Sequence, residues 1–147
     1  MAALSPGAWK TDAVEQGSTT GPAAGGIVVF AHDVDRIAAF YQQVLGLQRL
    51  DGDPTWVRFG GAHEVVVHGI PEEFAATSKP ADPPLVRDET AVKPWFAVAS
   101  LAASREVASR FGGWIADESR QWRFDVWDVC DGTDPEGNVI QLREMIG

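Results

Sequence analysis

The sequence predicts an α+β fold made of two tandem units, each ordered strand, helix and three further strands. A β-branched and aromatic run leads into an amphipathic helical pattern within residues 27–45, and the same order returns within residues 95–111. A polar residue suited to cap a helix stands between strand and helix in both places. Three short apolar segments, separated by turn residues, follow each helix. This repetition indicates two curved mixed sheets, each carrying one helix.

The first unit is expected to start with a strand and then a helix. Asp33 follows the strand as a good N-cap, because its carboxylate can accept hydrogen bonds from the free amides of the first helical turn. Gly46 suits the left-handed position that ends a helix. Apolar residues spaced three and four apart mark the buried helix face: Ile37, Phe40, Tyr41, Val44 and Leu45. The strands are expected at residues 27–31, 48–51, 55–59 and 64–68.

The second unit repeats this order. Ser100 is the expected N-cap, residues 101–111 carry the helical stripe, and Gly112 with Gly113 closes the helix. The tight turn at residues 134–138 needs a positive φ, which Gly137 can supply. The strands are expected at residues 95–99, 114–117, 122–128 and 139–144, with a further turn at residues 131–132.

The chain organisation follows from these elements. Residues 1–24 are expected to form a flexible tail, 25–70 the first module, 71–93 a linker or loop rich in proline, and 94–147 the second module. Each module is too small to bury a full core alone, so the two are expected to share one. A helix on one face of each sheet leaves the other face free to line a cleft.

Charge and cysteine content exclude several classes of function. Twelve basic and 21 acidic residues give a net charge of −9, which argues against binding to nucleic acid or an anionic membrane. Cys130 is the only cysteine, so an intramolecular disulfide is impossible and a cytoplasmic location is expected. The N-terminus lacks the basic and apolar regions of a secretory signal, and no apolar run approaches the ~20 residues of a membrane helix.

Three segments carry a family resemblance. The segments from Asp33 to Arg36, from Phe40 to Leu47 and from Asp134 to Glu144 together resemble the vicinal oxygen chelate superfamily. That superfamily includes glyoxalase I, bleomycin-resistance proteins and extradiol dioxygenases. The resemblance implies paired βαβββ modules that curl into half-cups, with a ligand cavity formed by two modules, often from two chains. A homodimer is therefore expected.

The metal positions of the family are poorly matched here. The resemblance implies one ligand from each of four strands. The first position falls on Gly26, the third on residues 93–96, which hold no His or carboxylate, and the last on Gln141. The second lies within residues 64–68, where Glu64 and His68 share one face. At most two positions could coordinate a metal, whereas catalytic sites usually use three protein ligands. Neither a metal site nor another cofactor is expected.

Six tryptophans in 147 residues indicate an aromatic ligand site instead. Indoles suit flat organic molecules and offer cation–π surfaces. Seven acids between residues 115 and 137 predict an acidic rim, which favours a cationic aromatic ligand. The alternative is that the tryptophans are core or dimer-interface residues and that His68 is an ordinary sheet histidine. The candidate ligand-binding residues are Trp56, His68, Trp95, Trp122, Trp127 and Gln141.

The leading hypothesis is metal-independent binding of a small molecule, similar to the bleomycin-resistance branch. The second is a metal-dependent lyase, isomerase or dioxygenase with an atypical site at His68 and Gln141, or at Glu64 and Gln141, completed by a partner chain or the substrate. The third is a structural or regulatory module whose pocket has closed.

Overall fold

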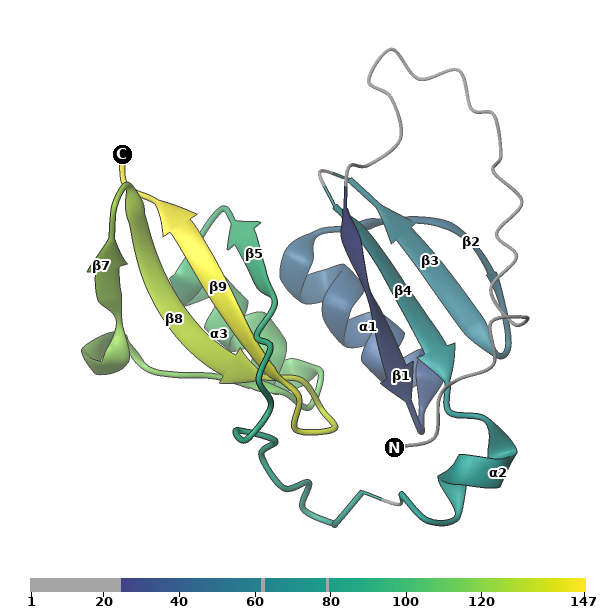
Figure 1. Cartoon of the computed structure of the whole chain (residues 1–147). Coiled ribbons are helices and arrows are strands. Elements are labelled where there is room, and N and C mark those ends of the chain that lie inside the picture. Colours follow the sequence, from purple (N-terminus) through teal and green to yellow (C-terminus); the bar gives the residue numbers. More distant parts are fainter. Residues whose placement is uncertain (1–24, 62, 79) are drawn as a thin grey trace.

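Two curved sheets flank a pair of helices in the computed structural model, which describes residues 25–61, 63–78 and 80–147 (Figure 1). The expected tail at residues 1–24 lies outside these ranges. In the first sheet the strand order is β1-β4-β3-β2, with β1 parallel to β4 and the other pairs antiparallel. Its elements are β1 (Gly26–Ala31), α1 (Val34–Leu45), β2 (Gln48–Asp53), β3 (Trp56–Gly60) and β4 (Glu64–Gly69).

The second sheet repeats this topology after a connection that contains a short helix, α2 (Glu72–Ala75), which the sequence pattern did not predict. The strand order is β5-β9-β8-β6, β7 also pairs with β8, and β5 is parallel to β9. Its elements are β5 (Trp95–Val98), α3 (Leu101–Arg110), β6 (Trp114–Ile115), a 3-10 turn (Glu118–Arg120), β7 (Trp122–Phe124), β8 (Trp127–Thr133) and β9 (Val139–Met145). The predicted α+β class with two curved mixed sheets is confirmed, and the second unit carries four strands after its helix instead of the three predicted.

The predicted ends of the helices are confirmed in both units. The Asp33 carboxylate accepts a hydrogen bond from the Arg36 amide at 3.0 Å, and Gly46 adopts φ 63°. The Ser100 hydroxyl accepts from the Ala103 amide at 3.2 Å. None of the helices within the described ranges is long and apolar enough to cross a membrane.

The predicted strand at residues 122–128 is wrong. The chain reverses at Asp125, which adopts φ 52°, so that β7 and β8 form a hairpin. The expected turn at residues 131–132 lies instead inside β8, where Gly132 pairs with Ile115. A Cβ at Gly132 would lie only 2.4 Å from the Trp114 carbonyl oxygen, so this glycine permits close strand approach rather than a turn.

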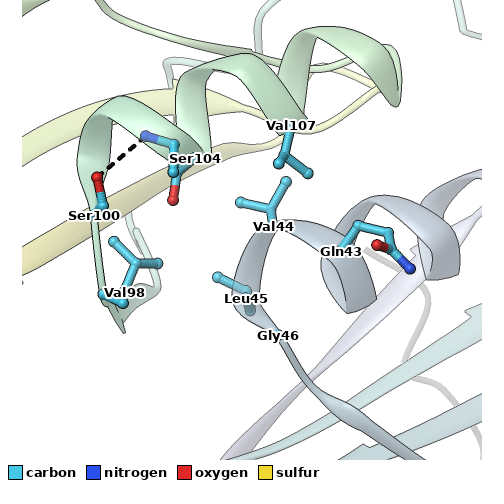
Figure 2. A pocket seen from close by; sticks show the side chains of 10 residues that line it. Gln43, Val44, Leu45, Gly46, Val98, Ser100, Ser104 and Val107 are labelled. Carbon is cyan, nitrogen blue, oxygen red and sulfur yellow. Dashed lines mark hydrogen bonds between the residues drawn. The ribbon is translucent and has the colours of Figure 1, made fainter.

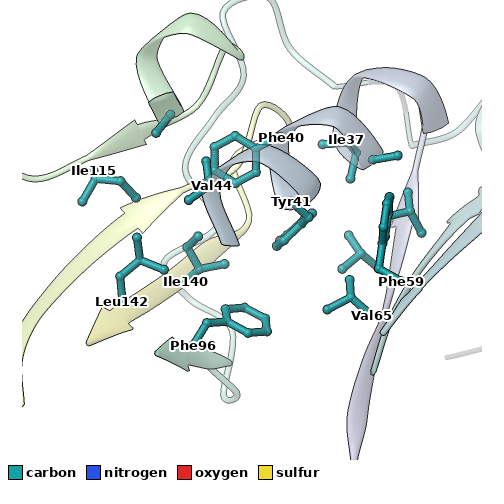
Figure 3. Packing of buried hydrophobic residues seen from close by; sticks show 14 of the residues in the cluster. Ile37, Phe40, Tyr41, Val44, Phe59, Val65, Phe96, Ile115, Ile140 and Leu142 are labelled. Atoms are coloured by element: carbon teal, nitrogen blue, oxygen red, sulfur yellow. The ribbon is translucent and has the colours of Figure 1, made fainter. Parts of the chain in front are cut away.

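One apolar core joins the two units. Helix α1 packs against α3 and against strands of both sheets, and its Tyr41 ring lies 6.2 Å from the Phe96 ring of β5 (Figure 3). Phe59 and Val65 reach this core from the first sheet, and Ile140 reaches it from the second. The core lies on the faces that α1 and α3 cover, and neither of these two helices covers the opposite face of its sheet.

A buried polar link also joins the units, and it corrects an expectation. Asp134 and Glu136 were expected among the acids of an exposed rim, but they are only 2% and 5% exposed. The Tyr41 hydroxyl donates to Asp134 at 3.0 Å, and Glu136 accepts from the His32 and Asp33 amides at 2.8 and 3.0 Å. Burial first, and then the negative charge of Asp134, raises the pKa of Tyr41 well above its ordinary value.

Candidate ligand-binding surface

Strand alternation decides which side chains reach the helix-free face of the second sheet. Phe96 and Leu142 are neighbours across β5 and β9 and are buried against the helices. Since successive side chains in a strand point to opposite faces, the next pair, Trp95 and Gln141, lies on the helix-free face. The same register puts Asp131 on this face beside Gln141.

An aromatic cluster occupies this face. The rings of Trp95 and Trp127 lie 6.0 Å apart, and the guanidinium of Arg143 lies 4.2 Å from the Trp95 ring centre and 5.3 Å from that of Phe124. Trp95 is 40% exposed and Phe124 57%. We call this group, with Gln141, the aromatic face. Large aromatic side chains left open to water on one face are typical of interaction surfaces.

A chain of polar contacts fixes the base of the aromatic face. Lys93 Nζ lies 2.6 Å from Asp131 Oδ2. The Gln141 amide nitrogen donates to Asp131 Oδ1 at 3.3 Å, and its oxygen accepts from Arg143 Nε at 2.8 Å. Gln141 therefore orients the guanidinium that lies over Trp95.

The first sheet meets this surface at one end of β4. His63, just before β4, has its ring 6.2 Å from that of Trp95. Nearby, Arg58 makes a salt bridge with Asp51 at 2.7 Å and a second with Glu64 at 3.5 Å. The hydrogen bonds from Arg58 lower the pKa of the Asp51 carboxyl. Both modules thus border the aromatic face, and the charges on the first-sheet side are paired.

The six candidate residues fall into two separate groups. Trp95, Trp127 and Gln141 come together, and Trp122 lies on the same face in β7, opposite Val129. Trp56 and His68 are paired across β3 and β4 of the first sheet. His68 lies near the end of β4, five residues beyond the His63 that touches Trp95, so about 17 Å of strand separates the groups. The His68 ring packs 5.8 Å from Phe30, with Nδ1 2.7 Å from the Gly69 carbonyl oxygen.

Most of the acids that suggested a cationic ligand are buried or engaged by other protein groups. Asp134 and Glu136 are buried in the link between the units. Asp128 lies 3.4 Å from Arg123, and Asp131 is engaged by Lys93. Asp117 caps the 3-10 turn by accepting hydrogen bonds from the Ser119 hydroxyl and amide, which in that order lower the pKa of its carboxyl. Five of the seven acids are therefore buried or engaged by other protein groups, which weakens the case for a cationic ligand.

The donor set for a family-type metal is incomplete in this chain. The register pairs Gly26 with Glu64 on the first sheet and Trp95 with Gln141 on the second. Only Glu64 and Gln141 offer oxygen donors at these positions, and Glu64 is held by Arg58. No three His, Cys, Asp or Glu side chains among residues 25–61, 63–78 and 80–147 cluster closely enough to hold an ion. These residues do not fit the metal that the superfamily implies.

A hollow of about 230 Å³ lies elsewhere, between the end of α1 and the start of α3 (Figure 2). Val44, Val98 and Val107 line it, and its polar side chains are Gln43, Ser100 and Ser104. No titratable side chain reaches it. The hollow is a packing gap between helix ends, and the aromatic face offers the richer chemistry.

Sequence reasoning missed Arg143, Phe124, Lys93 and His63. The first could have been found, because Arg143 follows Gln141 by two positions and so shares its face. Phe124 required the β7–β8 hairpin to be recognised. The contacts of Lys93 and His63 arise only from tertiary packing.

Comparison with known proteins decides the family. The model of the glyoxalase-like domain family matches residues 26–143, which is most of the chain. The chain belongs to this family. The expected membership of the vicinal oxygen chelate superfamily is thereby confirmed, and the family fold matches the two curved sheets described above. No curated protein matches the chain.

Solved structures share the fold at low sequence identity. A glyoxalase/bleomycin resistance protein/dioxygenase family enzyme from Burkholderia phytofirmans PsJN is similar with TM-score 0.61 and 19% identity, over 83% of this chain and 98% of that one. A glyoxalase/bleomycin resistance protein from Albidiferax ferrireducens T118 gives 0.56 and 15%, over 82% and 96%. The fosfomycin resistance protein FosX from Mesorhizobium loti gives 0.56 and 9%, over 82% and 89%. At these identities the likeness shows the fold alone.

Proposed function

We propose that this glyoxalase-like protein binds a small aromatic molecule on the aromatic face, without a metal ion. The observation that carries the proposal is the pair of indoles, Trp95 and Trp127, 6.0 Å apart on a face that no helix covers. A flat ring laid against them would remove apolar surface from water at about 25 cal/mol per Å². Binding of this kind needs an apolar surface and a few placed polar groups, which Gln141 and Arg143 supply.

The names of solved structures with this fold are compatible with a small-molecule ligand. Solved structures with this fold include a fosfomycin resistance protein and a glyoxalase/bleomycin resistance protein, whose names refer to small molecules. The sequence-based preference for a cationic ligand is not carried forward, because most of the acids that suggested it are buried or engaged by other protein groups.

The alternative, a metal-dependent lyase, isomerase or dioxygenase, would need further donors from a second chain or the substrate. Gln141 with either His68 or Glu64 leaves the site short of the usual three protein ligands. Titration of the full chain with Ni²⁺ and Zn²⁺ tests this directly. Stoichiometric binding that Glu64→Ala and Gln141→Ala both abolish would favour the enzyme over the proposal.

We further propose that the protein acts as a homodimer in the cytoplasm. Beside the aromatic face, the β7–β8 hairpin and the end of β9 expose an apolar patch of Trp122 (42%), Val126 (48%) and Met145 (62%). A second copy covering this patch would remove it from water. The cytoplasmic assignment rests on the lone Cys130, which is buried and free. Sedimentation should show a dimer that Val126→Lys dissociates, whereas Leu85→Lys, at an exposed position of the connection, should not.

Tryptophan fluorescence tests the binding proposal. The neutral probe 2-naphthamide, added to the full chain in the presence of a chelator, is expected to quench emission saturably. Trp95→Ala and Trp127→Ala should each weaken binding about tenfold, since base-like stacking on an indole contributes ~1–3 kcal/mol. Trp114→Ala is the matched control, because Trp114 is 49% exposed on β6, at the far end of β8 from Trp127. Equal effects of all three substitutions would contradict the proposal.

A further inference from the structure

We propose that the ligand is an aromatic acid whose carboxylate is bound by the guanidinium of Arg143 while its ring lies against Trp95 and Trp127. This inference rests on the proposed function, since it names the chemical class of the molecule that the aromatic face takes. It assigns to Arg143 a recognition role that the sequence pattern did not suggest.

Contacts on the aromatic face restrain the side chain of Arg143. Its guanidinium lies 4.2 Å from the Trp95 ring centre and 5.3 Å from that of Phe124, and its Nε donates to Gln141 at 2.8 Å. Two aromatic rings and one hydrogen bond together restrict the plane of the group. A restrained guanidinium loses less freedom when it binds a carboxylate, so it is pre-organised for that partner.

The positive charge of Arg143 is the second feature that favours an acid. No Asp or Glu of the described residues lies within ion-pair distance of Arg143. The neighbouring Asp131 is already engaged by Lys93 at 2.6 Å and by the Gln141 amide. Glu144, the next residue, lies on the opposite face and accepts from the Leu101 amide at 2.7 Å. Arg143 therefore presents an uncompensated positive charge.

Arg58 provides a contrast within the same chain. On the first sheet, Arg58 Nε and one terminal nitrogen both bond Asp51 at 2.7 Å, and the other terminal nitrogen lies 3.5 Å from Glu64. Arg58 is therefore already paired with carboxylates of the protein. The two terminal nitrogens of Arg143 make no hydrogen bond to another side chain or carbonyl of the described residues. The protein itself supplies the carboxylates that bind Arg58, whereas an incoming ligand would supply the carboxylate that binds Arg143.

The charge of Arg143 and the shape of the aromatic face favour the same kind of ligand. A guanidinium presents two parallel N–H groups that match the two oxygens of a carboxylate, and such charged hydrogen bonds are about twice as strong as neutral ones. Trp95 and Trp127 offer apolar ring surface beside it. A planar acid can use both features at once. An aromatic cation would put like charge against Arg143 and is disfavoured.

Three matched probes test the inference on the full chain: 2-naphthoate, the neutral 2-naphthamide and the cationic 2-naphthylmethylammonium. We expect 2-naphthoate to bind at least about tenfold more tightly than 2-naphthamide, since the charged pair adds hydrogen bonds that the amide cannot make. The cation should bind more weakly than the amide. Isothermal titration gives all three dissociation constants.

Substitutions then assign the preference to its residue. Arg143→Gln should abolish the tenfold preference for the acid, and Arg143→Lys should retain only part of it, because an ammonium lacks the planar fork. Arg120→Gln is the matched control: Arg120 also lies over an indole, 5.7 Å from the Trp114 ring centre, but in the 3-10 turn beyond β6. Unfolding temperatures of all variants show whether each still folds.

The outcomes separate the two proposals. If acid and amide bind equally, or if Arg143→Gln keeps the preference, the aromatic acid is refuted while the binding proposal stands. If the cation binds most tightly, the aromatic acid is refuted and a cationic ligand, as the sequence predicted, is favoured. If none of the three probes binds, the proposed function fails as well.

Discussion

Tyr41 gives the sharpest test of how the two units are joined. It is the only tyrosine in the chain, and its hydroxyl donates to Asp134 in the core between the sheets. Burial is the largest cause of its raised pKa, followed by the charge of Asp134. The folded protein should therefore keep the phenolic proton at pH values where a free tyrosine, with pKa 10.0, has lost it.

The effect on stability follows from the proton count. Above pH 10 the unfolded chain loses the phenolic proton while the folded chain retains it, so the folded state binds more protons and the free energy of unfolding falls as pH rises. Below pH 10 both states are protonated and Tyr41 contributes no pH dependence. The loss should be about 1 kcal/mol over the first pH unit above 10, and it then approaches about 1.4 kcal/mol per unit.

Two measurements check this expectation. Tyrosinate absorbance, followed during an alkaline titration, should stay absent until the protein unfolds. Urea unfolding at several alkaline pH values should show the free energy of unfolding falling as pH rises. Tyr41→Phe should remove the part of that fall that comes from the phenolic proton. That variant should also be less stable at neutral pH by about 1.5 kcal/mol, the value for a hydrogen bond to a charged group whose other partners remain. Reversible tyrosinate absorbance near pH 10 in the folded protein would refute the reasoning.

Four further substitutions probe turns and helix ends, each measured by urea unfolding. Gly137→Ala should cost about 2–4 kcal/mol, because Gly137 has φ 85° and a Cβ would lie 2.1 Å from a backbone oxygen, whereas Gly46→Ala, at φ 63° but with open space, should cost only about 1 kcal/mol. Equal costs would show that the close approach is relieved freely. Glu136→Gln should cost about 1–3 kcal/mol, since this buried carboxylate holds the amides before α1. Glu144→Gln should cost less, about 0.5–1 kcal/mol, because its partner is the amide at the start of α3; the reverse order would contradict this account.

The sequence was sufficient for the elements whose signals are local. Asp33, Gly46 and Ser100 act at helix ends as their chemistry requires, and Gly137 adopts the positive φ expected of its turn. The β7–β8 hairpin was missed because Asp125 reverses the chain without a glycine or proline. Gly132 was misread because its small size serves strand packing, which depends on a residue distant in sequence.

The candidate site was only partly accessible for the same reason. Sequence reasoning named Trp95, Trp127 and Gln141 as candidates, but only the strand register of the fold groups them and separates them from Trp56 and His68. Which acids are free, however, depends on their partners. Only the fold shows that Asp131 is taken by Lys93 and that Arg143 is left without a carboxylate.

The central claim, that the aromatic face is the binding surface, is tested most directly by nuclear magnetic resonance with added 2-naphthoate. The indole N–H resonances of Trp95 and Trp127, assigned by substitution, should shift in parallel with saturation. The methyl resonances of Val98 and Val107, which line the hollow between α1 and α3, should stay unchanged. Saturable shifts of those methyl groups with unmoved indole resonances would contradict the account.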